Sequence, residues 1–284
     1  MRLPSGLSLA LTAALLAAAA PPAAASPRRV VALAPSAAEI AYALGAADLV
    51  VGVSDFAADL PDSSGKARLG GFVPDLERVA ALKPDLALVS RDGTDRRSAE
   101  RIESLGIPVV VTDASTLDGV FEDVRRVGAA LGRAGAAETL VASLAARAAA
   151  AAASAPRRAD GRRPKALALI WPDPPIVAGR GTFVGDLLER AGLENAAPAT
   201  AGEWPRVTHE TLVAWAPRLL VRPDTPENAA AFTKAFAPGS RWSLHPAVRD
   251  GRVVVLPGAW LERPGPRLVD ALEALVARLR EMRP

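Results

Sequence analysis

The chain has 284 residues, a net charge of +3, two histidines and no cysteine. Cysteine-ligated metals and cysteine nucleophiles are therefore excluded, and two histidines alone do not make a zinc site. Acidic and basic residues are interspersed along the chain, which argues against a nucleic-acid partner. The length is sufficient for one large domain or two medium ones.

The first 25 residues have the pattern of a secretory signal peptide. Arg2 precedes an apolar run from Leu7 to Ala20, and small residues follow at positions 23–25. The alternative is a membrane anchor, but the apolar run is shorter than the roughly 20 residues that cross a bilayer, and two prolines follow it. We expect the protein to leave the cytoplasm as a soluble monomer, with cleavage near Ala25.

Residues 28–114 alternate short apolar runs with helical patterns, which predicts an N-terminal α/β lobe with a mostly parallel sheet. Ser36 and Glu39 have the spacing of a capping box, so we expect them to begin the first helix. The predicted strands are 30–34, 49–53, 85–90 and 108–112, and the predicted helices are 36–44, 76–82 and 95–105.

Residues 115–156 contain no strand pattern. Ser115 with Asp118 can cap a helix that runs to Leu131, and residues 132–135 should break or kink it. The alanine-rich run that follows has a high helix propensity, which predicts a long stiff helix, with a disordered linker as the alternative. We expect this segment to link two lobes.

The alternation resumes in residues 164–284 and predicts a C-terminal α/β lobe of similar build. We expect an amphipathic helix at the end of the chain, carrying Leu268, Leu272, Leu275 and Leu279 on one face. The other predicted elements are strands at 166–170, 219–221 and 253–256 and helices at 182–191 and 208–216.

Residues 75–86 and 208–219 follow one plan: an N-cap residue, a glutamate two positions later, a proline seven positions after the glutamate, then a strand. The two lobes are therefore expected to be related halves. Either glutamate alone, Glu77 or Glu210, is explained by stabilisation of its helix by about 0.3–1 kcal/mol. As a matched pair, they suit docking on a two-fold symmetric partner through arginine–carboxylate pairs.

Aromatic and arginine side chains in loops are the candidates for ligand binding. Ligands of parallel α/β sheets bind beyond the carboxyl ends of the strands, and a broad flat ligand relieves the hydrophobic cost of exposed rings there. Packing between lobes is the alternative for each ring, and a solvated side chain for each arginine. The candidates are Phe56, Phe72, Arg91, Trp171, Trp204, Trp260 and Arg263.

Motifs along the chain resemble the periplasmic binding proteins for cobalamin and ferric siderophores. They include VVALAPSAAE at 30–39, Gly70-Gly71-Phe72, LKPDL at 82–86, GRGTF at 179–183 and WLERPGPR at 260–267. Each is weak alone, but they occur in order over nearly all of the chain that follows the signal. The resemblance implies two Rossmann-like lobes with central parallel sheets, joined by a long rigid helix. It also implies the periplasm as the destination of the protein, and a two-fold symmetric ABC permease whose arginines engage Glu77 and Glu210.

Within this family the chain is most similar to the cobalamin-binding branch, through Trp204-Pro205 and the run 260–263. It departs at Ser90 and Ala259, where that branch often has a tryptophan and an acidic residue, and it lacks that branch's disulfide. Cobalamin is the first expected ligand, with haem or a ferric siderophore as alternatives, and no metal is held by protein ligands. A two-lobed enzyme is the remoter alternative, because the sequence has no nucleophile elbow, Walker-type loop or histidine cluster; no catalytic residue and no cofactor are expected.

Overall fold

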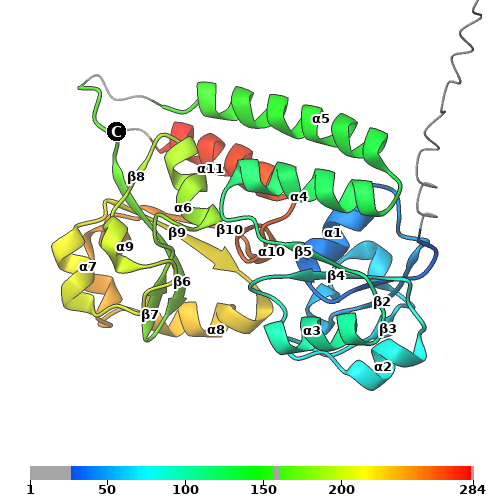
Figure 1. Ribbon diagram of the computed structural model, residues 1–284. Coiled ribbons are helices and arrows are strands. Elements are labelled where there is room, and N and C mark those ends of the chain that lie inside the picture. Colours follow the sequence, from blue (N-terminus) through cyan, green and yellow to red (C-terminus); the bar gives the residue numbers. More distant parts are fainter. Residues whose placement is uncertain (1–26, 157–159, 283–284) are drawn as a thin grey trace, which may run out of the picture.

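Two mostly parallel sheets form the centres of two lobes, here called the N-lobe (the elements up to β5) and the C-lobe (the elements from β6) (Figure 1). The computed structural model describes residues 27–156 and 160–282. The signal peptide expected at residues 1–25 lies outside the described residues. The predicted fold class, two α/β lobes with parallel sheets, is confirmed.

The N-lobe sheet has the strand order β3-β2-β1-β4-β5, and every pairing in it is parallel. All residues of β4 are buried, as expected for a strand covered by helices on both faces. The strands are β1 (Val30–Ala32), β2 (Val50–Val53), β3 (Ala67–Arg68), β4 (Leu86–Ser90) and β5 (Val109–Thr112), and the helices are α1 (Pro35–Ala43), α2 (Leu76–Ala81) and α3 (Arg96–Ser104). The sequence patterns predict all of these except β3, which is too short to show an alternation.

The C-lobe sheet has the order β10-β9-β6-β7, with β8 also paired to β6. Only β7 runs antiparallel among the described strands of this sheet. The strands are β6 (Lys165–Pro172), β7 (Pro175–Val177), β8 (Glu194–Asn195), β9 (Leu219–Asp224) and β10 (Val253–Pro257). The helices are α6 (Phe183–Arg190), α7 (His209–Trp215), α8 (Pro226–Ala235), α9 (Pro246–Arg249), α10 (Gly258–Leu261) and α11 (Leu268–Glu281).

Two helices, α4 (Leu117–Ala130) and α5 (Ala134–Ala153), connect the lobes, and the predicted break lies between them. In Figure 1, α5 runs along the top of the molecule over both lobes, and it packs on α4 and α11. Arg147 ties α5 to α11, with Asp270 and Glu273 at 2.5 and 2.6 Å. Among the described helices, α5 alone has the length and apolar composition of a membrane span. Its buried stripe is Ala137, Val141, Leu144, Ala148 and Ala151, at spacings of about one turn.

Two of the predicted helix caps are wrong. The capping box of Ser36 and Glu39 does not form, because α1 begins after Ala34 without a side-chain cap and both residues are buried inside the helix. Helix α4 is capped by Thr116, whose hydroxyl accepts a hydrogen bond from the backbone N–H three residues later, and not by Ser115. Glu39 is therefore free to contact the other lobe.

The sequence repeat is visible in the backbone. The side chains of Asp75 and Thr208 cap α2 and α7 as predicted, each accepting a hydrogen bond from the backbone N–H three residues later. Behind each helix, the residue before the proline, Lys83 or Ala216, has a φ of 47° or 50°, and these are the two non-glycine residues with positive φ in the described chain. Side chains rarely tolerate this conformation. Its occurrence at equivalent places supports two related halves.

Candidate functional site

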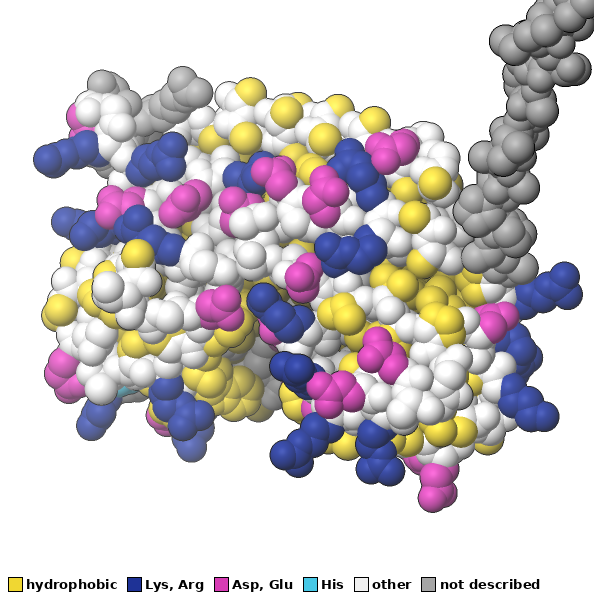
Figure 2. Space-filling view, in the orientation of Figure 1, with side chains coloured by type: hydrophobic (Ala, Val, Ile, Leu, Met, Phe, Trp, Pro, Cys, Tyr) yellow, Lys and Arg dark blue, Asp and Glu magenta, His cyan; other side chains and the backbone are white. Residues whose placement is uncertain are grey.

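A pocket of about 300 Å³ lies between the lobes, at the carboxyl ends of β4 and β5 in the N-lobe and of β6 in the C-lobe. Figure 2 shows the surface hollowed there, with hydrophobic side chains on the C-lobe side and charged side chains on the N-lobe side. The N-lobe lining is Pro35, Ser36, Ser90, Asp92, Gly93, Thr112, Asp113 and Ala114. The C-lobe lining is Ile170, Phe183, Trp204, Leu261, Glu262, Arg263 and Pro264. The volume is at the low end for ligand pockets, so a large ligand would extend beyond it.

Phe183 and Trp204 form an aromatic wall on the C-lobe side of the pocket. Their ring centroids are 5.7 Å apart in an edge-to-face arrangement. Phe183 is buried at the start of α6, behind the cap made by Thr182, whereas Trp204 is 37% exposed. A ring held by a buried neighbour keeps its orientation, so Trp204 offers a flat apolar contact to a ligand.

Carboxylates outnumber basic groups in the lining of the pocket, with Asp92, Asp113 and Glu262 against Arg263. Asp92 is 3.2 Å from the guanidinium of Arg91. Desolvation by the cleft walls raises the pKa of Glu262, while the charge of Arg263 opposes the shift. The pocket therefore favours a neutral ligand over a strongly anionic one.

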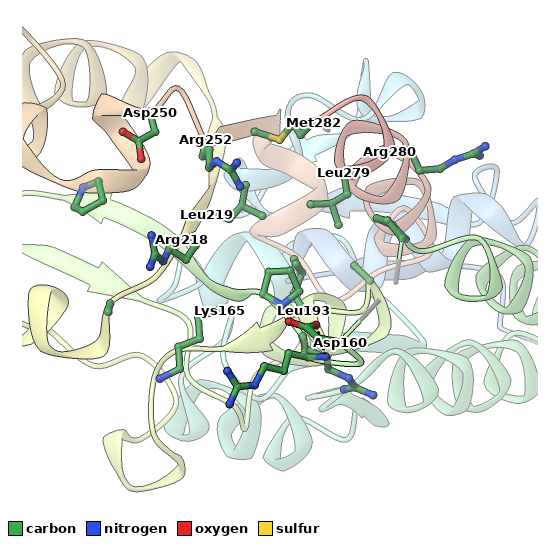
Figure 3. A pocket seen from close by; sticks show the side chains of 17 residues that line it. Asp160, Lys165, Leu193, Arg218, Leu219, Asp250, Arg252, Leu279, Arg280 and Met282 are labelled. Carbon is green, nitrogen blue, oxygen red and sulfur yellow. Dashed lines mark hydrogen bonds between the residues drawn. The ribbon is translucent and has the colours of Figure 1, made fainter. Parts of the chain in front are cut away.

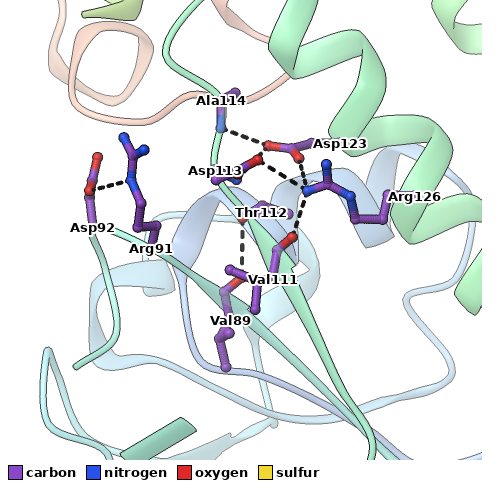
Figure 4. Close-up of polar contacts among 9 residues, drawn as sticks. All are labelled: Val89, Arg91, Asp92, Val111, Thr112, Asp113, Ala114, Asp123 and Arg126. Carbon is purple, nitrogen blue, oxygen red and sulfur yellow. Dashed lines mark hydrogen bonds and ion pairs between the residues drawn. The ribbon is translucent and has the colours of Figure 1, made fainter. Parts of the chain in front are cut away.

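Asp123 holds the end of β5 against α4 (Figure 4). Its buried carboxylate accepts hydrogen bonds from the backbone N–H groups of Asp113 and Ala114, both at 3.0 Å, and from Arg126 at 2.8 Å. Burial raises the pKa of Asp123 to about 6, against the effect of these hydrogen bonds and of Arg126. Because Asp113 and Ala114 line the pocket, Asp123 fixes the position of part of its wall.

Two arginines that precede α11 join the lobes. The guanidinium of Arg263 donates to the carboxylate of Asp59 at 2.7 Å and to the carbonyl of Phe56 at 3.1 Å. The backbone N–H and the guanidinium of Arg267 contact the carboxylate of Glu39 at 2.9–3.0 Å, and the Glu39 side chain is only 7% exposed. Burial opposes ionisation of Asp59, but the hydrogen bond and charge of Arg263 lower its pKa. Neither inter-lobe contact was expected from the sequence.

Two of the seven predicted ligand-binding residues, Trp204 and Arg263, line the pocket. Phe56 and Phe72 lie outside it in N-lobe loops, after β2 and between β3 and α2, and their side chains are 58% and 51% exposed. Arg91 directly follows β4, where its partner Asp92 borders the pocket.

Trp171 and Trp260 are half-buried and do not line the pocket. Trp171 lies near the end of β6 and its indole N–H donates to the carbonyl of Asp173 at 2.9 Å. Trp260 lies in α10 and packs against the main hydrophobic core. Two lining residues absent from the prediction, Asp92 and Asp113, lie just after β4 and β5, so the same strand-end argument applied to acidic residues would have found them.

Glu77 and Glu210 occupy the first turns of α2 and α7 and are exposed. These two helices lie at opposite ends of the molecule (Figure 1). A backbone hydrogen bond and the hydroxyl of Thr208 lower the pKa of Glu210. Both carboxylates are thus available to a partner that spans the two lobes.

The tyrosine and the two histidines lie away from the pocket lining. The hydroxyl of Tyr42 is 3.4 Å from that of Ser63, on the N-lobe. His209 and His245 both pack on Trp242, at ring-centroid distances of 5.0 and 5.8 Å. Burial lowers the pKa of His245. Within residues 27–156 and 160–282, no group of three or more His, Cys, Asp or Glu side chains is placed to hold a metal ion.

The chain matches the family model described as periplasmic binding protein over residues 30–259. It is 32% identical over 253 residues to the cobalamin-binding protein of Halobacterium salinarum, a match that covers 87% of this chain and 68% of that protein. It is 31% identical over 254 residues to YvrC of Bacillus subtilis, an uncharacterized ABC transporter substrate-binding lipoprotein, covering 88% of this chain and 79% of that protein. The solved structure of the periplasmic haem-binding protein RhuT from Roseiflexus sp. RS-1 matches with a TM-score of 0.78 and 29% identity, covering 89% of this chain and 98% of that one.

These matches extend over both lobes and the helices between them. They confirm the family resemblance and exclude the enzyme alternative, because the family consists of substrate-binding transport proteins. Members act outside the cytoplasm, with a small-molecule ligand and a membrane permease as partners. The chain therefore belongs to the periplasmic binding protein family, the substrate-binding proteins of ABC importers.

Proposed function

We propose that the protein captures cobalamin, or a closely related corrinoid, between its lobes and delivers it to the permease of its importer. The composition of the inter-lobe pocket carries the proposal: Trp204 provides an aromatic wall, and the lining carboxylates outnumber the basic groups. Cyanocobalamin has a broad ring face, many neutral amides and no net charge, so it suits both features. The exported protein begins after cleavage near Ala25 and acts as a monomer.

Haem suits the pocket less well than a corrinoid. Haem iron commonly takes a histidine, tyrosine, cysteine or methionine side chain as an axial ligand, and the tyrosine and histidines of this chain lie outside the pocket lining. The carboxylates that line the pocket would also repel the negatively charged propionates of haem. Cobalamin brings its own axial ligands. The match to RhuT keeps haem as the second candidate, followed by a ferric siderophore.

The groups around the pocket also suit a ligand that is rich in amides and larger than the pocket itself. One guanidinium nitrogen of Arg263, Nη1, is buried without a hydrogen-bond partner in the described chain. An amide carbonyl of the ligand would satisfy it. Phe56 and Phe72 supply exposed apolar surface outside the pocket, where a large ligand would extend.

Isothermal titration calorimetry with cyanocobalamin tests the ligand, and a submicromolar Kd is expected. Trp204→Ala should weaken binding about 30-fold, roughly 2 kcal/mol, because it removes the aromatic wall. Trp215→Phe, in the C-lobe core and away from the pocket, is the matched control and should retain the affinity. Haem and a ferric hydroxamate are titrated in parallel. Tighter binding of either than of cyanocobalamin would refute the corrinoid assignment.

Docking on the permease through Glu77 and Glu210 is the second part of the proposal. It is supported by their equivalent places in the repeat and by their exposure at opposite ends of the molecule. A permease with two-fold symmetry would present the same basic surface to each lobe. Glu77 and Glu210 would then make equivalent contacts, one with each permease subunit. Arginine is the expected partner because it binds a carboxylate through two hydrogen bonds.

The double variant Glu77→Lys with Glu210→Lys should bind the reconstituted permease about 30-fold more weakly, roughly 2 kcal/mol, because attraction becomes repulsion. Surface plasmon resonance measures this binding, and the Kd for cyanocobalamin should stay unchanged. Glu103→Lys with Glu227→Lys changes the charge equally at exposed positions, one in each lobe, and serves as the control. A loss of ligand affinity in the first variant, or an equal loss of docking in both, would rule out the docking role.

A further inference from the structure

A second recess opens on the C-lobe, at the amino ends of its strands (Figure 3). Its volume is about 1130 Å³, and it is bordered by the starts of β6 and β9, by the residue before β10 and by the end of α11. The inter-lobe pocket lies at the opposite, carboxyl ends of these strands. The recess, here called the basic groove, is therefore a separate feature that ligand capture between the lobes does not use.

The basic groove is lined by six basic residues and two acidic ones, Asp160 and Asp250. All six basic side chains are exposed, and none has an ion pair or side-chain hydrogen bond to another described residue. Arginines elsewhere are commonly paired with carboxylates, as Arg147, Arg190 and Arg267 are. The six are Arg162, Arg163, Lys165, Arg218, Arg252 and Arg280. The groove therefore carries a net positive charge, which Asp160 and Asp250 offset only in part.

The floor of the basic groove is apolar. In Figure 3, Leu193 and Leu219 lie between the basic side chains of Arg218 and Lys165 on one side and Arg280 on the other. Both leucines are buried, and Leu279 and Met282 continue the apolar surface. A free phosphate ion would use only the cations and leave this surface in water. The arrangement suits an anion that is joined to an apolar body.

Nucleic acid is a poor match for the same groove. Proteins that bind single strands combine basic residues with aromatic rings on which bases stack. No aromatic side chain is among the described residues that line the groove. A lipid supplies what is present instead: a phosphate for the basic rim and acyl chains for the apolar floor.

We propose that the basic groove binds anionic phospholipids at the outer surface of the cytoplasmic membrane. The protein works beside this membrane, because its permease is embedded there. Each basic residue near an anionic membrane surface strengthens binding by about fivefold. Because the groove lies at the opposite ends of the strands from the inter-lobe pocket, this contact would hold the undocked protein at the membrane, and docking through Glu77 and Glu210 would follow its release.

Co-sedimentation with vesicles tests the proposal, using the exported and processed protein. Vesicles of phosphatidylcholine containing phosphatidylglycerol should bind the protein, and vesicles of phosphatidylcholine alone should not. The double variant Arg218→Glu with Arg252→Glu should bind the anionic vesicles at least about 25-fold more weakly, since two contributions of about fivefold are lost. Raising the salt concentration should weaken binding of the wild type in the same assay.

Arg97→Glu with Arg101→Glu, at exposed positions on α3 of the N-lobe, changes the net charge equally and should weaken binding less than fivefold. Circular dichroism checks that the variants fold. If Arg218→Glu with Arg252→Glu does not fold, the neutral double variant Arg218→Gln with Arg252→Gln takes its place. The groove variant should retain its affinity for cyanocobalamin, which separates this proposal from the ligand assignment. Equal losses in both variants, no preference for anionic vesicles, or calorimetric binding of inorganic phosphate without vesicle binding would each overturn the proposal.

Discussion

Glu39→Ala should lower the free energy of unfolding by about 3–4 kcal/mol, because it leaves the guanidinium of Arg267 without its partner between the lobes. The Glu39 side chain is 7% exposed and that of Arg267 is 29% exposed, so water replaces little of the lost contact. The backbone N–H of Arg267 also loses its acceptor. Urea denaturation followed by circular dichroism measures the change.

Two further variants compare the buried ion pair of Glu39 and Arg267 with an exposed surface ion pair. Glu39→Gln keeps an oxygen for the backbone N–H of Arg267 and should lose less than the alanine variant. Arg96→Ala breaks an exposed pair with Glu100, in which the arginine is 91% exposed, and should cost less than about 1 kcal/mol. A Glu39→Ala variant as stable as Arg96→Ala would show that the lobes are not held together through Glu39.

The wild type should lose about 2.4 kcal/mol of stability relative to Asp123→Asn as the pH rises from 4 to 7. The folded protein holds the Asp123 carboxyl with a pKa of about 6, against an ordinary value of 3.8. Between these values the folded state binds more protons than the unfolded state, so the free energy of unfolding falls as the pH rises, by about 1.4 kcal/mol per unit of pKa difference. Above pH 6 this contribution levels off.

The comparison requires urea denaturation of both proteins at several pH values between 4 and 7. Glu122→Gln, one position before Asp123 on α4 but exposed, is the control, and its stability should follow the wild type across the range. If the difference between the wild type and Asp123→Asn does not change with pH, then burial does not control the ionisation of this carboxyl. The opposite slope would mean that the hydrogen bonds and Arg126 dominate over burial.

Local sequence patterns were enough to predict most of the fold. The buried strands of the N-lobe are runs of valine, leucine and alanine that no helix periodicity interrupts, and the caps at Asp75 and Thr208 depend on neighbours three residues away. The elements that the sequence patterns did not predict include β3, β7, β8 and the short helices α9 and α10, all of them only two to four residues long. Helix α8 was also missed, although Thr225 and Asn228 form a capping box at its start.

Contacts between distant segments could not be predicted in the same way. Glu39 was assigned to a helix cap because its spacing from Ser36 fits one, but its partner Arg267 is 228 positions away. Arg263 was chosen as a ligand donor, and the structure adds a tie to Asp59, 204 positions away. Such pairs depend on how the lobes pack, which no local pattern records.

The candidate site was predicted in part. Trp204 was found because a large ring in a loop after a strand is uncommon without a role in packing or binding, and it does line the pocket. Asp92 and Asp113, which also follow strands, were not among the candidates, because only aromatic and arginine side chains were considered as ligand-binding groups. Asp123 carried a signal that was not used: it lies on the apolar face of α4, with Val120 and Val127, where an acidic residue needs buried partners.

A crystal structure of the protein with cyanocobalamin, in which the anomalous scattering of cobalt marks the metal, would locate the ligand. We expect one cobalt peak between the lobes, with the corrin ring against Trp204 and the lining carboxylates around the neutral amides. A cobalt peak outside the space between the lobes, or no peak from crystals grown with excess ligand, would contradict capture of the corrinoid between the lobes.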